Sequence, residues 1–198
     1  MKIKEVTFVA SYPEVSKCPK IEIPEFAFIG RSNVGKSSLL NFLANNSKLA
    51  KISSKPGKTK LINFFLINKH FHFVDLPGYG YAHFAKRERE KWEKIITNYI
   101  LSRQQLLQLF ILVDIRLKPQ TSDINAINFM GKYEIPFSII FTKIDKISKQ
   151  KLKTNITEFE KVLYKTWEEL PPRFITSSTK KIGKENILNY MESLLLQK

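Results

Sequence analysis

The sequence predicts an α/β fold: a single domain with a mostly parallel six-stranded sheet, one antiparallel edge hairpin, and helices on both faces. Short apolar runs alternate along the chain with longer segments in which apolar residues recur at helical spacing. Several glycine-rich or polar motifs follow directly after an apolar run. Because parallel strands present such motifs at one edge of their sheet, we expect a ligand site along the carboxyl ends of the strands.

Six apolar segments have the length and composition of strands: residues 26–29, 61–67, 71–74, 107–113, 137–141 and 174–175. Only Asn68 and Lys69 interrupt the second and third of these, which predicts a turn and an antiparallel hairpin at one sheet edge. Five further segments have helical patterns: residues 37–44, 86–101, 122–132, 149–165 and 185–196. We expect residues 1–22 to form an N-terminal extension and residues 23–198 to form the domain.

Length and composition limit the class of protein. A chain of 198 residues that is 43% hydrophobic can bury one sizeable core. Cys18 is the only cysteine, so no internal disulfide is possible and a reducing compartment is expected. The longest apolar run, residues 106–113, is far shorter than the roughly 20 residues of a membrane span. We expect a cytoplasmic monomer with no membrane association.

A glycine-rich loop, G-R-S-N-V-G-K-S, lies between the first expected strand and the first expected helix. Its glycines let backbone N–H groups turn toward phosphate oxygens, its lysine adds a cation at the β and γ phosphates, and its last serine offers a hydroxyl to Mg²⁺. The alternative is a chance match in an ordinary strand-turn-helix. The predicted triphosphate site comprises Gly30, Arg31, Ser32, Asn33, Val34, Gly35, Lys36, Ser37 and Ser38.

A second motif, T-K-I-D at residues 142–145, predicts which base is bound. The Asp145 carboxylate can accept two hydrogen bonds from the N1–H and N2–H₂ edge of guanine, and the stem of Lys143 can lie over the ring. Adenine lacks these donors, so GTP is favoured over ATP. Backbone groups after the last strand are expected to cover guanine O6, although such serine and threonine clusters also form turns or helix caps. The predicted base site comprises Thr142, Lys143, Ile144, Asp145, Thr176, Ser177 and Ser178.

Two segments between these motifs are predicted to respond to the γ-phosphate. Asp75, at the end of a strand, is expected to hold Mg²⁺ through water, and Gly78 to donate its N–H to the γ-phosphate. Thr59, in the preceding polar loop, is expected to complete the Mg²⁺ shell together with Ser37. Loss of the γ-phosphate would release both segments. Their predicted site residues are Gly57, Lys58, Thr59, Lys60, Leu61, Asp75, Leu76, Pro77 and Gly78.

In their order along the chain, G-R-S-N-V-G-K-S, P-G-K-T-K, D-L-P-G-Y-G-Y-A, T-K-I-D and T-S-S resemble the motifs of the bacterial GTP-binding proteins called EngB, YihA or YsxC. This family belongs to the Era-like group of translation-factor GTPases. The resemblance covers essentially the whole chain, and D-L-P-G-Y-G-Y-A, Trp92 and V-D-I-R at residues 113–116 are its most specific parts. It implies a single P-loop GTPase domain that binds GTP and GDP, acts in assembly of the large ribosomal subunit, and is needed for normal cell division and septation.

Catalytic roles are expected for Lys36, Thr59, Gly78 and Asn33. Ras-like enzymes place a water-orienting glutamine where this chain has Tyr79, so intrinsic turnover should be slow unless another group completes the site. Asn33 matches an asparagine with which several Era-like GTPases hold K⁺ beside the phosphates. The alternatives are that Asn33 only hydrogen-bonds the loop, or that the ribosomal partner supplies the missing group.

The charge distribution predicts an RNA partner. The chain has 33 basic and 18 acidic residues, a formal charge of +15, and no acidic residue between Glu25 and Asp75. This positive block exceeds what a nucleotide needs, so the RNA of the large ribosomal subunit is the expected counter-charge. A solvated lysine-rich surface is the alternative. Aromatic rings that could stack on bases, or pack under the switch instead, are Tyr79, Tyr81, His83 and Phe84.

Other function classes share parts of this pattern. A nucleoside kinase would have no use for T-K-I-D, and a tRNA-modification GTPase would need more domains than the length allows. A division- or membrane-associated GTPase, or a GTP-regulated RNA-binding adaptor without significant turnover, would have the same nucleotide motifs. These two alternatives stay open on the sequence alone.

Overall fold

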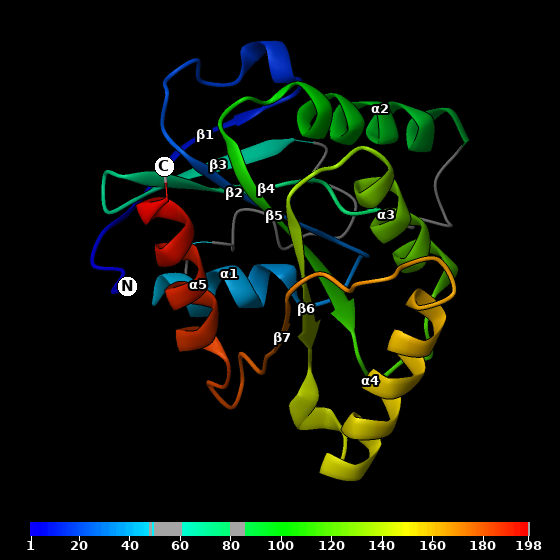
Figure 1. Ribbon diagram of the computed structural model, residues 1–198. Helices are drawn as coiled ribbons and strands as arrows, with labels where there is room; N and C mark the ends of the chain where they lie inside the picture. The colour runs from blue at the N-terminus through cyan, green and yellow to red at the C-terminus, as the bar shows by residue number, and fades with distance from the viewer. Residues whose placement is uncertain (48, 50–60, 80–85, 198) are drawn as a thin grey trace.

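The computed structural model describes residues 1–47, 49, 61–79 and 86–197, without the side chains of residues 86–92. The described residues form a sheet of seven strands in the order β1-β3-β4-β2-β5-β6-β7 (Figure 1). The pairs β1–β3 and β3–β4 are antiparallel, and all other neighbours are parallel. The strands are β1 (Val6–Tyr12), β2 (Glu25–Gly30), β3 (Ile62–Ile67), β4 (Phe71–Asp75), β5 (Leu106–Asp114), β6 (Phe137–Thr142) and β7 (Arg173–Ile175).

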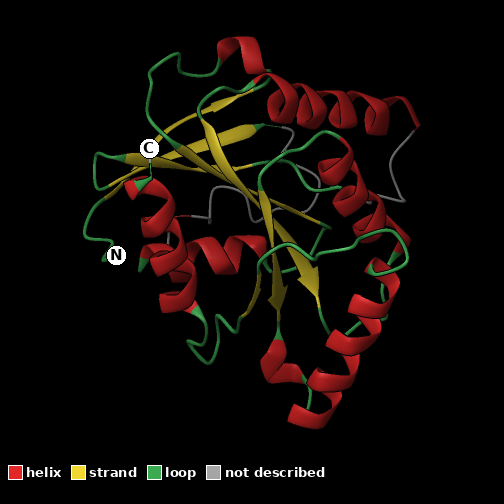
Figure 2. Cartoon of the chain, viewed as in Figure 1, coloured by secondary structure: helices red, strands yellow, loops and turns green. Residues whose placement is uncertain are grey.

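Helices cover both faces of the sheet, as Figures 1 and 2 show. Alternate residues of β2 point to opposite faces, so Ala27 and Ile29 join one core cluster and Phe26 and Phe28 the other. The first cluster packs against α2, α3 and α4, and the second against α1 and α5. The described α-helices are α1 (Lys36–Ala44), α2 (Lys86–Ser102), α3 (Thr121–Lys132), α4 (Lys149–Leu163) and α5 (Lys184–Leu196).

The predicted α/β fold is confirmed, with the expected helices and strands within a few residues of their predicted bounds. The predicted number of strands was wrong, because the sheet has seven strands rather than six. The additional strand is β1, in the segment expected to be an extension. It pairs with β3, so the hairpin of β3 and β4 lies one strand in from the edge.

β1 is held by its pairing with β3 and by contacts with the β3–β4 turn, and not by deep burial. Its residues are exposed or only partly buried, and Phe8 is 39% exposed. The strand therefore lacks the alternation of buried apolar and exposed polar residues by which a half-buried strand is predicted from sequence. The side chain of Asn68, in the β3–β4 turn, accepts from the backbone N–H groups of Lys4 and Glu5 and donates to the carbonyl of Lys2. Contacts with a turn more than 60 residues away therefore position the start of the chain.

A buried ionic cluster closes the amino end of β2. Glu25 is fully buried, and it accepts from the Tyr99 hydroxyl at 2.6 Å and from Arg103 Nε at 2.9 Å. Burial, followed by the charge of Glu25, raises the pKa of Tyr99 well above its ordinary value, so the phenol stays a donor. Because Arg103 and Tyr99 lie at the carboxyl end of α2, the cluster attaches this end of the helix to the sheet.

Among the described residues, no helix is both long and apolar enough to cross a bilayer.

Candidate functional site

The glycine-rich loop follows β2 directly and leads into α1. A side chain at Gly30 would have no room, because a Cβ there would lie 2.9 Å from Val34 Cγ1 and 3.0 Å from the Leu112 carbonyl oxygen. Gly35 has a φ of 105°, in the left-handed region that favours glycine. Gly35 is also the N-cap of α1, and no side chain described caps that end. The first-turn N–H groups of α1 thus suit an anion.

The loop's lysine meets the aspartate at the end of β4. Lys36 Nζ contacts Asp75 Oδ1 and donates to the Leu76 carbonyl at 2.8 Å. The Asp75 side chain is only 1% exposed, so this ion pair compensates for the cost of a buried charge. Asn63 Nδ2, on β3, lies 3.5 Å from the other carboxylate oxygen. The parallel pairing of β2 with β4 therefore brings the glycine-rich loop and the D-L-P-G segment together.

The segment after Asp75 runs beside the phosphate loop. The Leu76 N–H donates to the Phe28 carbonyl at 3.0 Å, and the Tyr79 N–H donates to the Gly30 carbonyl at 3.2 Å. Between them, Pro77 and Gly78 are buried. Gly78 is thus fixed on both sides by backbone contacts with β2 and the loop that follows it.

The T-K-I-D motif holds the phosphate loop from the other side. The Thr142 hydroxyl, at the end of β6, donates to the Val34 carbonyl at 2.7 Å. Lys143 Nζ donates to the Asn33 carbonyl and pairs with Asp114 Oδ2 at 2.9 Å. Both motifs predicted from separate parts of the sequence, for phosphate and for base, are therefore joined by direct hydrogen bonds.

The Asp145 carboxylate is oriented by the loop after β7. The Ser177 hydroxyl donates to Asp145 Oδ1 at 2.7 Å. This hydrogen bond is the main reason that the pKa of Asp145 lies below its ordinary value, so the group is ionised at neutral pH. The Ile144 N–H also donates to the Thr176 carbonyl at 3.3 Å. Only the backbone of Ser177 was predicted to act here; the role of its side chain was not predicted.

Asp114, part of V-D-I-R at residues 113–116, is a further residue of the site for which no role was predicted. Its carboxylate, 5% exposed, accepts from Arg116 Nε at 2.9 Å and from Lys143 Nζ. Burial raises the pKa of Asp114, but the hydrogen bonds from Arg116 and Lys143 outweigh burial, and the net pKa lies below the ordinary value. Asp114 therefore fixes the ammonium of Lys143. The contact between Asp114, at the end of β5, and Lys143, just after β6, is not evident from their spacing in the sequence.

A hollow of about 580 Å³ adjoins the carboxyl-terminal half of α1. It lies between α1 and the loop after β7, and Ser38 and Ser178, both predicted site residues, line it with Asn41 and Thr179.

Within the described ranges, no group of three or more histidine, cysteine, aspartate or glutamate residues could hold a metal by itself. Ser37 and Asp75 are hard oxygen donors of the kind that Mg²⁺ takes when phosphate oxygens or water supply its other ligands. The donor set thus fits a metal that arrives with a phosphorylated ligand rather than a resident metal centre.

Part of the predicted site lies outside the described residues. This applies to Gly57, Lys58, Thr59 and Lys60 and to the aromatic residues Tyr81, His83 and Phe84, as well as to the side chain of Trp92. Leu61, which precedes β3, is described and partly buried. Nucleotide binding by the whole predicted set stays a prediction.

Comparisons with known proteins bear on what this arrangement binds. A family model described as a 50S ribosome-binding GTPase matches residues 25–143. A probable GTP-binding protein EngB from Phocaeicola vulgatus is 54% identical over 194 residues, which cover 98% of this chain and 97% of that protein. The protein of the same description from Porphyromonas gingivalis is 53% identical, with 98% and 96% covered.

A solved structure supports the fold. The crystal structure of a probable GTP-binding protein engB aligns with a TM-score of 0.69 at 22% identity, covering 88% of this chain and 100% of that chain.

The Asp114 contacts predict a pH dependence. A carboxyl whose pKa is lower in the folded chain stabilises the fold above its unfolded pKa, ordinarily 3.8, and this stabilisation is lost as the pH falls through the folded pKa. Asp114→Asn should therefore lower the free energy of unfolding most at neutral pH, and the difference from the parent should narrow below about pH 4. Urea denaturation between pH 7 and pH 3 measures both. A difference that stays constant over this range would contradict the ionic role of Asp114.

Proposed function

The chain belongs to the EngB family of P-loop GTPases, and from this premise we propose that it is a GTP-controlled switch in assembly of the large ribosomal subunit. In the GTP-bound form it would dock on the subunit and its RNA, and slow hydrolysis to GDP would release it. The observation that carries the proposal is the pair of hydrogen bonds from Thr142 and Lys143 to the carbonyls of the phosphate loop. They support the proposal because they hold the T-K-I-D motif, whose Asp145 would read guanine, against the loop that would bind the phosphates.

Each part of the nucleotide has a proposed set of contacts. The loop amides of residues 30–38 and the ammonium of Lys36 would bind the phosphates. Asp145 would accept from the guanine edge, while the Ser177 hydrogen bond keeps this carboxylate ionised and oriented. The Lys143 stem would cover the base, because contacts with the Asn33 carbonyl and the Asp114 carboxylate hold its ammonium in place.

Mg²⁺ is the proposed cofactor. Ser37 and Asp75 would hold it, Asp75 through water, and Thr59, which lies outside the described residues, would complete the shell. When bound, Mg²⁺ neutralises charge on the phosphates. The protein's own share is to supply Lys36, whose contact with the buried Asp75 would give way to a contact with the phosphates.

Hydrolysis would be slow because Tyr79 replaces a water-orienting glutamine. Two groups could raise the rate: K⁺ held by Asn33, or a group of the ribosomal partner. Asn33 has an exposed side chain and a φ of 62°, and the carbonyl of this residue is fixed by Lys143. Its side chain is thus at the surface of a loop whose backbone is held in place, as a cation ligand beside phosphates would require.

The charge of the chain supports an RNA partner. The formal charge is +15, and residues 26–74 contain eight basic residues and no acidic one. Such a positive block binds a phosphate backbone strongly and with steep salt dependence. We propose a cytoplasmic monomer, whose loss would impair ribosome assembly and, through it, cell division and septation.

Loss of nucleotide binding should abolish ribosome association. Ser37→Ala should prevent GTP-dependent sedimentation with large subunits, because it removes the direct Mg²⁺ ligand. The measurement is co-sedimentation with purified large subunits in the presence of a non-hydrolysable GTP analogue or GDP. Ser193→Ala, which removes a helix hydroxyl bonded to the Tyr190 carbonyl in α5, is the matched control and should sediment like the parent. A Ser37 variant that associates as tightly as the parent regardless of nucleotide would rule out the switch.

Base preference should depend on Asp145. Asp145→Asn should lower GDP affinity by at least about a hundredfold and move preference toward xanthosine diphosphate, whose 2-oxo group accepts where guanine donates. Calorimetric titration with both nucleotides measures this change. Glu160→Gln, which removes a carboxylate on α4 that pairs with Arg173 of β7, should leave guanine preference intact. Unchanged guanine preference in the Asp145 variant would remove its assigned role.

The K⁺ role of Asn33 can be separated from activation by the ribosome. If Asn33 holds K⁺, single-turnover GTP hydrolysis should be at least about tenfold faster in K⁺ than in Na⁺. Asn33→Ala should lose this difference between K⁺ and Na⁺ while keeping the parent's rate in Na⁺. The control Asn186→Ala, at an exposed position on α5, should keep the difference. Equal rates in both salts, with stimulation by large subunits, would favour a ribosomal group instead. No hydrolysis under any of these conditions would favour the adaptor alternative.

A further inference from the structure

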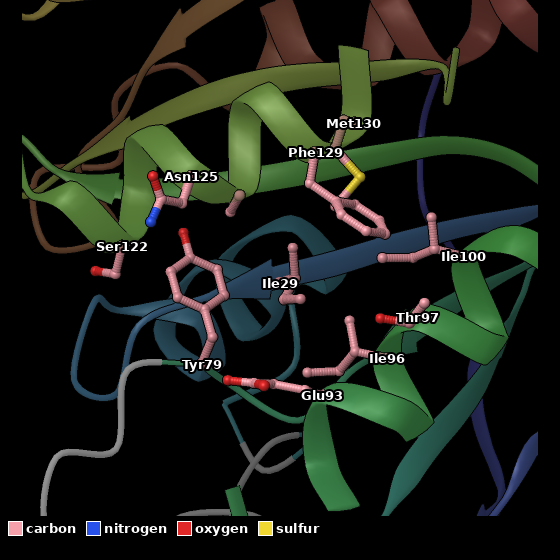
Figure 3. Close-up of a pocket in the computed structure, with 11 residues that line it drawn as sticks. Ile29, Tyr79, Glu93, Ile96, Thr97, Ile100, Ser122, Asn125, Phe129 and Met130 are labelled. Carbon is pink, nitrogen blue, oxygen red and sulfur yellow. The ribbon is translucent and has the colours of Figure 1, made fainter. Parts of the chain in front are cut away.

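Tyr79 directly follows the predicted γ-phosphate contact, Gly78, and its side chain is engaged elsewhere. Its phenol oxygen donates to Asp123 Oδ1 at 3.0 Å, in the first turn of α3. Figure 3 shows the ring between α2 and α3, with the phenol oxygen directed toward the amino-terminal turn of α3, near Ser122 and Asn125. A water-orienting role would require this oxygen to face the phosphates instead.

Asp123 connects Tyr79 to the phosphate loop. Its side chain is 2% exposed, and the carboxylate oxygen that accepts from Tyr79 also lies 3.4 Å from Arg31 Nε. Arg31 is the loop residue whose backbone is paired with that of Tyr79. One buried oxygen therefore joins three segments: the phosphate loop, the turn that ends at Tyr79, and α3.

Burial favours this link over a solvent-facing phenol. The ring packs against the core cluster that contains Ile29 and Ile96. Burial, and next the charge of Asp123, raises the pKa of Tyr79 well above its ordinary value, so the hydroxyl remains protonated and can donate. Hydrogen bonds to a buried carboxylate are stronger than those between neutral groups, and a lost donor leaves the acceptor underpaired.

We propose that Tyr79 is a positioning residue, whose hydrogen bond to Asp123 fixes the adjacent Gly78 and thereby sets how strongly the chain prefers GTP to GDP. The inference rests on the proposed function, in which the Gly78 N–H donates to the γ-phosphate. Tyr79 would thus occupy the position of a catalytic glutamine without taking part in the chemistry. Its backbone and side chain hold Gly78 from two directions, through Gly30 and through Asp123.

The chain contains a matched control for this cluster. At the opposite end of β2, Tyr99 donates to Glu25 at 2.6 Å and Arg103 donates to the same carboxylate at 2.9 Å. This is again a buried tyrosine, carboxylate and arginine. Tyr99→Phe removes one phenol oxygen from an equivalent setting, but far from the predicted nucleotide contacts.

The experiment compares Tyr79→Phe, Asp123→Asn, their double variant, Tyr99→Phe and the parent. Affinities for a non-hydrolysable GTP analogue and for GDP are measured by calorimetry, and single-turnover hydrolysis at saturating GTP is measured in parallel. Tyr79→Phe should lower the ratio of analogue affinity to GDP affinity by about fivefold, with GDP affinity unchanged. Asp123→Asn should also lower this affinity ratio. In the double variant the ratio should fall by less than the product of the two single-variant factors. Tyr99→Phe should unfold at lower urea and keep the parent's ratio.

The outcomes separate this inference from the function on which it rests. A parent that binds both nucleotides equally would contradict the switch as well as the positioning role. A parent that prefers the analogue, with a Tyr79 variant of the same ratio, would contradict only the positioning role. Hydrolysis that falls in the Tyr79 variant while the affinity ratio stays constant would overturn it in favour of a direct catalytic role. If Tyr99→Phe changed the affinity ratio as much as Tyr79→Phe, the change would be a general effect of lower stability, and the positioning role would be contradicted.

Discussion

The candidate site depends on one set of contacts, in which two consecutive residues at the end of β6 hold the backbone of the phosphate loop. Thr142 donates to the Val34 carbonyl and Lys143 to the Asn33 carbonyl, while Asp114 fixes the lysine from β5. The register of β5 and β6 places Asp114 opposite Thr142, which brings Asp114 to the neighbouring Lys143. If the loop binds the phosphates and Asp145 reads the base, as proposed, a ligand that spans both must match the spacing that these contacts maintain.

The two ends of β2 have different tasks. Its carboxyl end continues into the phosphate loop, where Arg31 faces Asp123 across from Tyr79. Its amino end carries Glu25, which binds the last turn of α2 through Tyr99 and Arg103. The helix that follows the predicted switch segment is therefore attached to the sheet at its far end.

The helices and most strands could be predicted from sequence because apolar periodicity is a local property. The exception, β1, is held by pairing with β3 and by Asn68, neither of which leaves a pattern within residues 6–12. In the site, glycine spacing and the T-K-I-D string located the loops. The side chains that orient them, Asp114, Asp123 and the Ser177 hydroxyl, were not predicted, because each acts on a residue that lies 29 to 44 positions away.

The left-handed backbone at Asn33 and Lys143 has a consequence for affinity. Both residues have a φ of 62°, a conformation that costs a lysine about 1 kcal/mol or more. Their mutual contact and the Asp114 ion pair maintain it, so the chain itself meets the cost during folding. If these two turns contact the nucleotide, as proposed, binding does not have to order them and loses less entropy. Preorganisation of this kind converts folding stability into tighter binding.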